Sequence, residues 1–119
     1  MAELPVACSL TEPELAERRA GALADVRRSL EEARWLSDGV CLRFAPEPER
    51  LAMLATFVDL ERRCCAFLRF HLTVEPGGGP IWLELTGPPG TREFLVAEGL
   101  GLAPAARRRS AVPSRRPKR

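Results

Sequence analysis

Apolar residues recur every three or four positions in two separate stretches of the chain, a spacing that predicts amphipathic helices. The first stretch covers residues 12–27, with the stripe Leu15, Ala16, Arg19, Ala22, Leu23 and Val26. The second follows Pro46-Glu47-Pro48 and covers residues 48–66, with the stripe Leu51, Leu54, Val58, Glu61, Cys65 and Leu68. The second stripe is unusual because one of its members, Glu61, is a carboxylate.

Alternation of apolar and polar residues predicts two β-hairpins. In the first, Val40, Leu42 and Phe44 alternate with polar positions after an Asp-Gly turn, a strong hairpin signal. Its other arm, residues 30–36, is either a strand or the end of the preceding helix. The second hairpin joins residues 68–74 to 81–86 through a Gly-rich loop, and we expect it to be polar on one face, where Trp82 alternates with apolar neighbours.

The predicted elements, with a short helix over residues 91–98, sum to α-ββ-α-ββ-α. We therefore expect an α+β fold with a four-stranded, mostly antiparallel sheet covered by helices. Residues 1–102 form the predicted single domain. Residues 103–119 are mainly Ala, Pro, Ser and Arg, so we expect a disordered Arg-rich tail.

The net charge of +2 is divided unevenly between this tail and the body. The tail carries seven basic residues and no acidic one, which leaves the body with 11 basic and 16 acidic residues, or −5. We therefore do not expect nucleic-acid binding except nonspecifically through the tail.

No stretch is apolar enough to span a membrane, and the N-terminus resembles no signal peptide. The prediction is a cytoplasmic protein with reduced thiols, and a homodimer stays open.

The cysteines carry the main chemical signal. The chain has four, Cys8, Cys41, Cys64 and Cys65, without a Cys-x-x-Cys motif, and its single histidine excludes a Cys2His2 zinc finger. The adjacent Cys64 and Cys65 would close a strained ring if bonded to each other, so we expect two thiols. Thiolates suit Hg(II), Cu(I), As(III) and Zn(II), which indicates a soft-cation site.

Further ligands for such a site must come from elsewhere in the chain. Cys8 is the best candidate, since it lies just before the first helix, whose N-terminus favours a thiolate. Glu61 lies one turn before the pair and is either a base or oxygen ligand, or the partner of an arginine in an ion pair. Cys41 shares a strand face with Arg43 and is left out of the site, while His71 lies on a polar face and is a solvated or interface residue; whether either contributes stays open.

Three segments resemble a known sequence pattern. They are residues 8–11 (Cys-Ser-Leu-Thr), 61–70 (Glu-Arg-Arg-Cys-Cys-Ala-Phe-Leu-Arg-Phe) and 80–88 (Pro-Ile-Trp-Leu-Glu-Leu-Thr-Gly-Pro). They are similar to a family of small uncharacterised bacterial proteins with Cys-Thr-Leu, Glu-x-x-Cys-Cys-Pro-Phe and a strand ending in Thr-Gly/Ala-Pro, and to C-terminal extensions of some mercury-resistance-type regulators. Ala66 and Ser9 replace the family's proline and threonine, and Cys41 is outside the pattern. The resemblance implies heavy-metal handling.

Three functions follow from these observations. The leading hypothesis is soft heavy-metal binding or sensing through Cys8, Cys64 and Cys65, with Glu61 beside them. The first alternative is a small thiol-dependent enzyme, a reductase or transferase that uses the Cys64-Cys65 pair and takes Glu61 as base. The second alternative is a non-catalytic regulatory or interaction module whose cysteines are merely packed, a role that burial of both Cys64 and Cys65 would favour.

Overall fold

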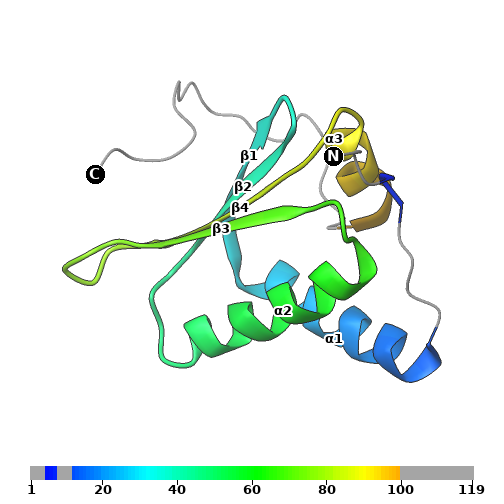
Figure 1. Ribbon diagram of the computed structural model, residues 1–119. Coiled ribbons are helices and arrows are strands. Elements are labelled where there is room, and N and C mark those ends of the chain that lie inside the picture. The colour runs from blue at the N-terminus through cyan, green and yellow to red at the C-terminus, as the bar shows by residue number, and fades with distance from the viewer. Residues whose placement is uncertain (1–4, 8–11, 100–119) are drawn as a thin grey trace.

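The computed structural model describes residues 5–7 and 12–99, and within them it confirms the α+β fold (Figure 1). The predicted disordered tail, residues 103–119, and Cys8 lie outside the described residues. The elements are α1 (Pro13–Ser29), β1 (Leu30–Leu36), β2 (Gly39–Phe44), α2 (Arg50–Cys64), β3 (Arg69–Val74), β4 (Ile81–Thr86), α3 (Thr91–Phe94) and the π-helical turn η1 (Leu95–Gly99).

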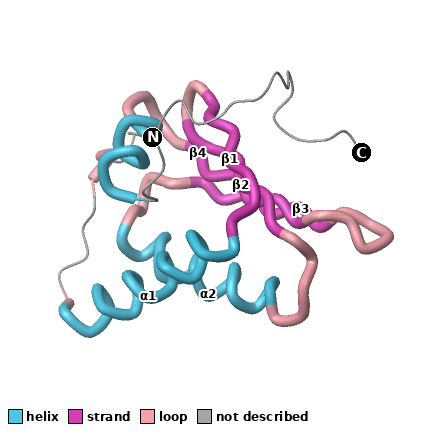
Figure 2. Tube along the Cα trace, turned by 180° about the vertical axis from the view of Figure 1, so that it is seen from behind, coloured by secondary structure: helices cyan, strands magenta, loops and turns pink. Residues whose placement is uncertain are grey.

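Helices α1 and α2 lie side by side and cover one face of the sheet (Figures 1 and 2). The first predicted stripe is buried at Ala22, Leu23 and Val26 of α1. The second is confirmed only in part: Leu54 and Glu61 of α2 are buried, but Leu51 is exposed, and the core also takes Phe57 and Leu60, which lie outside the predicted stripe. Pro13 starts α1 where its missing N–H costs nothing. The apolar stripes therefore dictate how the two helices pack.

The four strands form an antiparallel sheet in the order β1-β2-β4-β3. Residues 30–36 are a strand, so the helical alternative for this arm is wrong. Pairing of Ala33 with Leu42 and of Trp35 with Val40 across the turn overrides the helical preference of the Glu-Glu-Ala-Arg segment.

Strand β4 corrects the prediction of a polar face on the second hairpin. Strand β4 lies between β2 and β3, so side chains of its neighbours flank it on both faces; residues 81–85 are buried, and Trp82 is only 2% exposed. The guanidinium carbons of Arg34 and Arg43 lie 4.7 and 5.8 Å from the centre of the Trp82 ring on the face away from the helices. These cation–π contacts shield the indole from water.

The C-terminal helical segment closes the end of the core. The hydroxyl of Thr91 donates to the Pro88 carbonyl at 2.7 Å at the start of α3. The Phe94 ring meets Phe67 edge-on at 5.1 Å between centroids. Phe67 follows Cys64 and Cys65 by only a few residues, so this contact fixes the chain just beyond the end of α2.

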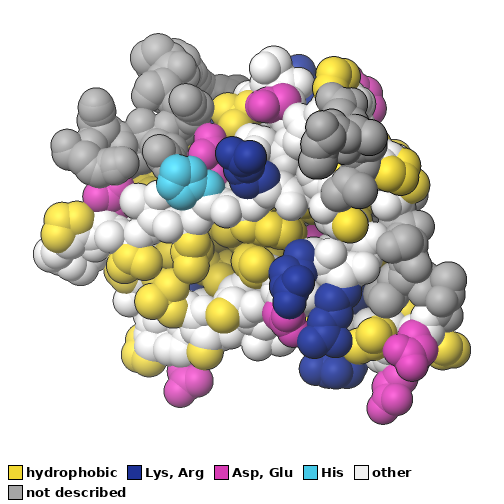
Figure 3. All heavy atoms as spheres, viewed as in Figure 1, with side chains coloured by type: hydrophobic (Ala, Val, Ile, Leu, Met, Phe, Trp, Pro, Cys, Tyr) yellow, Lys and Arg dark blue, Asp and Glu magenta, His cyan; other side chains and the backbone are white. Residues whose placement is uncertain are grey.

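One apolar area stays uncovered, between α2 and the edge strand β3. Leu51, Leu72 and Val74 are 43%, 40% and 53% exposed, and apolar side chains gather in this region in Figure 3. Leu72 and Val74 belong to the helix-facing side of the sheet but lie beyond the reach of α2. Among the described residues, no helix combines the length and apolar character needed to cross a membrane.

Two glycines give a matched test of this packing. A Cβ on Gly39 would lie 1.8 Å from the Leu85 carbonyl oxygen, whereas one on Gly21, within α1, would meet nothing within 4 Å. We expect Gly39→Ala to destabilise the protein by about 1–3 kcal/mol through overpacking. Gly21→Ala should stabilise it by about 0.5–1 kcal/mol. Urea unfolding measures both, and equal effects would contradict the close approach of β2 to β4.

Candidate functional site

The last turn of α2 places Glu61, Cys64 and Cys65 together. Cys64 is the final helical residue, and Cys65 caps the helix with φ −118° and ψ 79°, while its N–H still donates to the Glu61 carbonyl at 2.7 Å. The Cys65 carbonyl accepts from Leu68 N–H at 3.1 Å, which turns the chain toward β3. The non-helical backbone of Cys65 therefore determines where its sulfur lies relative to that of Cys64.

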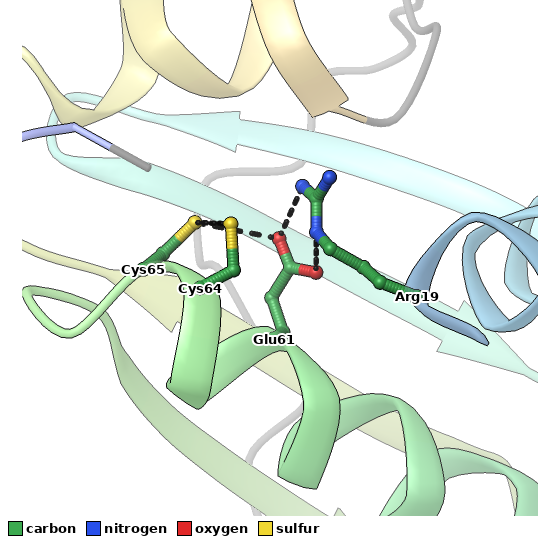
Figure 4. Close-up of polar contacts among 4 residues, drawn as sticks. All are labelled: Arg19, Glu61, Cys64 and Cys65. Carbon is green, nitrogen blue, oxygen red and sulfur yellow. Dashed lines mark hydrogen bonds and ion pairs between the residues drawn. The ribbon is translucent and has the colours of Figure 1, made fainter. Parts of the chain in front are cut away.

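The two sulfurs lie close to each other and to a carboxylate (Figure 4). Cys65 Sγ is 3.6 Å from Cys64 Sγ and 3.7 Å from Glu61 Oε2. Both distances are within the range of weak hydrogen bonds from a thiol, so the Cys65 S–H can donate to the carboxylate. The sequence prediction that these three side chains form one cluster agrees with these distances.

Glu61 is held by a bidentate ion pair with Arg19 of α1. Arg19 Nε lies 2.9 Å from Oε1 and Nη2 lies 3.0 Å from Oε2, and the side chains are 15% and 3% exposed. The alternative interpretation of Glu61 as the partner of an arginine is confirmed. Its role as a base stays a prediction, and it now concerns a carboxylate whose two oxygens already accept from a guanidinium.

Arg19 is the one residue of this cluster that the sequence analysis did not single out. Its signal was present, since Arg19 falls within the apolar stripe of the first helix just as Glu61 falls within that of the second. Two opposite charges, each in an otherwise apolar helical face, are typical of a buried interhelical pair. The sequence marks both positions as unusual, but only the packing of α1 on α2 shows that they meet.

The oxidation state of Cys64 differs from the prediction of a thiol. Cys64 is a disulfide cysteine, whereas Cys65 and Cys41 are thiols. Cys64 is thus not bonded to Cys65, in agreement with the strain expected for a vicinal disulfide. No described cysteine is the partner of Cys64, and Cys8, the predicted third ligand, lies outside the described residues.

Both sulfurs of the pair are buried. Cys64 and Cys65 are fully enclosed in the core cluster that also contains Leu60 and Phe67. This burial is the observation that favours the packed-cysteine alternative. Among residues 5–7 and 12–99, no group of three or more His, Cys, Asp or Glu side chains is arranged to hold a metal ion.

The charged pair next to the sulfurs is costly to bury. Removing a carboxylate and a guanidinium from water costs several kcal/mol, and apolar residues of similar volume often stabilise a core as well or better. What the bidentate pair adds is a directional contact between α1 and α2, one turn before the two sulfurs.

Cys41 and His71 lie in another part of the molecule. Cys41 is buried but outside the core cluster of Cys64 and Cys65, and it pairs with Arg34 and Glu84 on neighbouring strands. His71 is 58% exposed, and its Nδ1 lies 3.8 Å from Glu84 Oε1. Neither residue joins the thiol cluster.

Comparison with known proteins gave no match, either to a protein-family model, to a curated protein or to a solved structure.

A test of the ion pair follows from its burial. We expect Arg19→Ala to destabilise the protein by about 3–5 kcal/mol, because it leaves the Glu61 carboxylate buried and uncompensated. The double variant Arg19→Met/Glu61→Met should recover most of that loss. Arg63→Ala, which removes an exposed i,i+4 pair with Asp59, is the control and should cost about 0.5 kcal/mol or less. Arg19→Met and Glu61→Met are also measured singly. If their changes in the free energy of unfolding add up to that of the double variant, the two residues are not coupled.

Proposed function

We propose that the reduced protein binds one soft cation through the thiolates of Cys64 and Cys65, with Cys8 as third ligand and Glu61 beside the site. The observation that supports this most is the distance of 3.6 Å between the two sulfurs. Two thiolates on one ion, with bonds of about 2.3 Å, lie about 3.5–4 Å apart. The end of α2 thus already holds two ligands at a usable spacing.

The neighbouring carboxylate offers an acceptor for a thiol proton. Metal binding requires deprotonated sulfur, so each ligand must lose its proton when the ion enters. Glu61 Oε2, 3.7 Å from Cys65 Sγ, can accept that proton in passing. Arg19 neutralises Glu61, which leaves the charge of the cation to compensate the new thiolates.

The disulfide at Cys64 sets a condition on this function. A sulfur in a disulfide is not a thiolate ligand, so the cation binds only after Cys64 is reduced. Reducing compartments keep such cysteines as thiols. The resemblance to extensions of mercury-resistance-type regulators adds support for a heavy-metal role of this segment.

Metal titration of the reduced protein tests the proposal. We expect about one thiol-dependent equivalent of Cd(II) or Hg(II), seen as a thiolate-to-metal absorption band. Cys64→Ser and Cys65→Ser should each weaken binding by about 100-fold or more, beyond the effect of losing a hydrogen bond to a ligand. Cys41→Ser is the control, since Cys41 is equally buried but outside the cluster, and it should bind as the original chain does.

Unchanged stoichiometry and affinity in Cys64→Ser would reject the metal site. Circular dichroism of each variant separates loss of a ligand from loss of the fold. If a variant without cysteines binds no metal but still binds a protein partner, the result would instead favour the interaction module with packed cysteines.

A second candidate function is thiol–disulfide exchange, which one specific observation favours: a thiol, Cys65, lies 3.6 Å from a disulfide sulfur, Cys64 Sγ. Cys65 loses its proton to Glu61, and its sulfur attacks Cys64 Sγ. The Cys64–partner bond breaks, the partner sulfur leaves as a thiolate and takes the proton, and a Cys64–Cys65 disulfide forms. The exchange is redox-neutral, and the strained product would be a strong oxidant toward a thiol substrate.

Trypsin makes this exchange visible, because cleavage after Arg63 and Arg69 releases both cysteines on one peptide, residues 64–69. The oxidised protein is quenched in acid, alkylated with N-ethylmaleimide and digested. We expect a fraction of this peptide to be internally oxidised and unlabelled. Cys65→Ser should abolish that fraction, and Glu61→Gln should slow its formation after transfer from acid to neutral pH. Finding Cys65 fully alkylated at every time would exclude the exchange.

A further inference from the structure

The spacing of the two sulfurs also discriminates among soft ligands. We propose that the reduced Cys64-Cys65 pair is a chelate for trivalent arsenic bearing one other substituent, as in an organoarsenical. This inference rests on the proposed soft-ligand function but not on Cys8. It uses only Cys64 and Cys65, whose sulfurs lie 3.6 Å apart in the structure, where Cys64 is in a disulfide.

The two sulfurs subtend an angle at a bound atom that suits trivalent arsenic. With a separation of 3.6 Å and bonds to the central atom of about 2.3 Å, the S–X–S angle is about 100°. Trivalent arsenic is pyramidal because of its lone pair, and its bond angles are close to this value. A linear two-coordinate Hg(II) or Cu(I) would need the sulfurs about 4.6 Å apart, twice the bond length.

The backbone on either side of Cys65 limits how far the two sulfurs can separate. The Cys65 backbone is tied to Glu61 on one side and to Leu68 on the other. The pair is therefore held near the pyramidal spacing.

Arsenic with one organic substituent also needs fewer protein ligands than a tetrahedral ion, which needs four donors. Arsenic that keeps one organic substituent needs only two thiolates. The Cys64-Cys65 pair then completes its coordination by itself.

The reaction balances without an oxidant or reductant. In an arsenoxide, R–As=O, arsenic forms one bond to each sulfur. The two S–H bonds break, and their protons leave with the arsenic-bound oxygen as water. The product is neutral, which suits a buried site beside the already neutralised pair of Glu61 and Arg19. Glu61 Oε2 is positioned to carry the Cys65 proton.

Phenylarsine oxide is the probe for this inference. The full chain, reduced with a phosphine that does not compete as a dithiol, is treated with one equivalent and analysed by intact mass and tryptic mapping. We expect one phenylarsenic group on residues 64–69. Cys8→Ser and Cys41→Ser should keep it, and Cys64→Ser and Cys65→Ser should each lose it.

A competitor peptide of residues 61–69 tests whether the fold matters, since it carries the same two cysteines. We expect the folded protein to bind phenylarsine oxide about tenfold or more tightly than the peptide, because its two thiols are preorganised. Equal partition, or an adduct that needs Cys8, would overturn the arsenic assignment. If the arsenical fails while Cd(II) still binds one equivalent, only this inference falls; if neither binds, the proposed function falls with it.

Discussion

The structure around the cysteines depends on one interaction, the bidentate ion pair between Arg19 and Glu61. It joins α1 to α2 inside the helix contact, where each side chain replaces an apolar residue of its stripe. Because a guanidinium fork meets a carboxylate in one planar arrangement, the pair adds a directional constraint to the packing of α1 on α2 that apolar side chains do not supply. This constraint acts one turn before the two sulfurs.

The pair also decides what chemistry the cluster can support. Without Arg19, the Glu61 carboxylate would repel a thiolate formed at Cys65. With Arg19 in place, Glu61 stays a neutralised acceptor 3.7 Å from Cys65 Sγ. A buried polar network is costly unless all its members are satisfied. Here the thiol, the carboxylate and the guanidinium satisfy one another across two helices.

Local periodicity was sufficient to predict the elements but not their neighbours. The two helices and the second hairpin follow directly from apolar spacing, and the Asp-Gly turn locates the first hairpin. The ambiguity over residues 30–36 arose because helix propensity and strand pairing compete there, and pairing with β2 prevails. The covering of Trp82 could not be predicted, because the order β1-β2-β4-β3 makes β4 central and no local pattern encodes strand order.

The candidate site was partly predictable for a similar reason. The adjacency of Cys64 and Cys65 and their distance in sequence from Glu61 are properties of one helix, so sequence spacing places them together. Arg19 comes from a different helix, and only the packing of α1 on α2 shows that the two charged interruptions meet. The disulfide state of Cys64 depends on a second cysteine and on redox conditions, which spacing within one segment does not contain.

A constraint on any function of the cluster follows from the use of one sulfur for two purposes. Cys64 Sγ is either half of a disulfide or a thiolate ligand, and it cannot be both. Cys65, the neighbouring thiol, is half of a chelate only when Cys64 is reduced, and is a nucleophile toward Cys64 only when Cys64 is oxidised. The two proposed functions, ligand binding and sulfur exchange, therefore belong to different redox states of the same pair of residues. The Arg19–Glu61 pair, which contains no sulfur, can hold the end of α2 in both states.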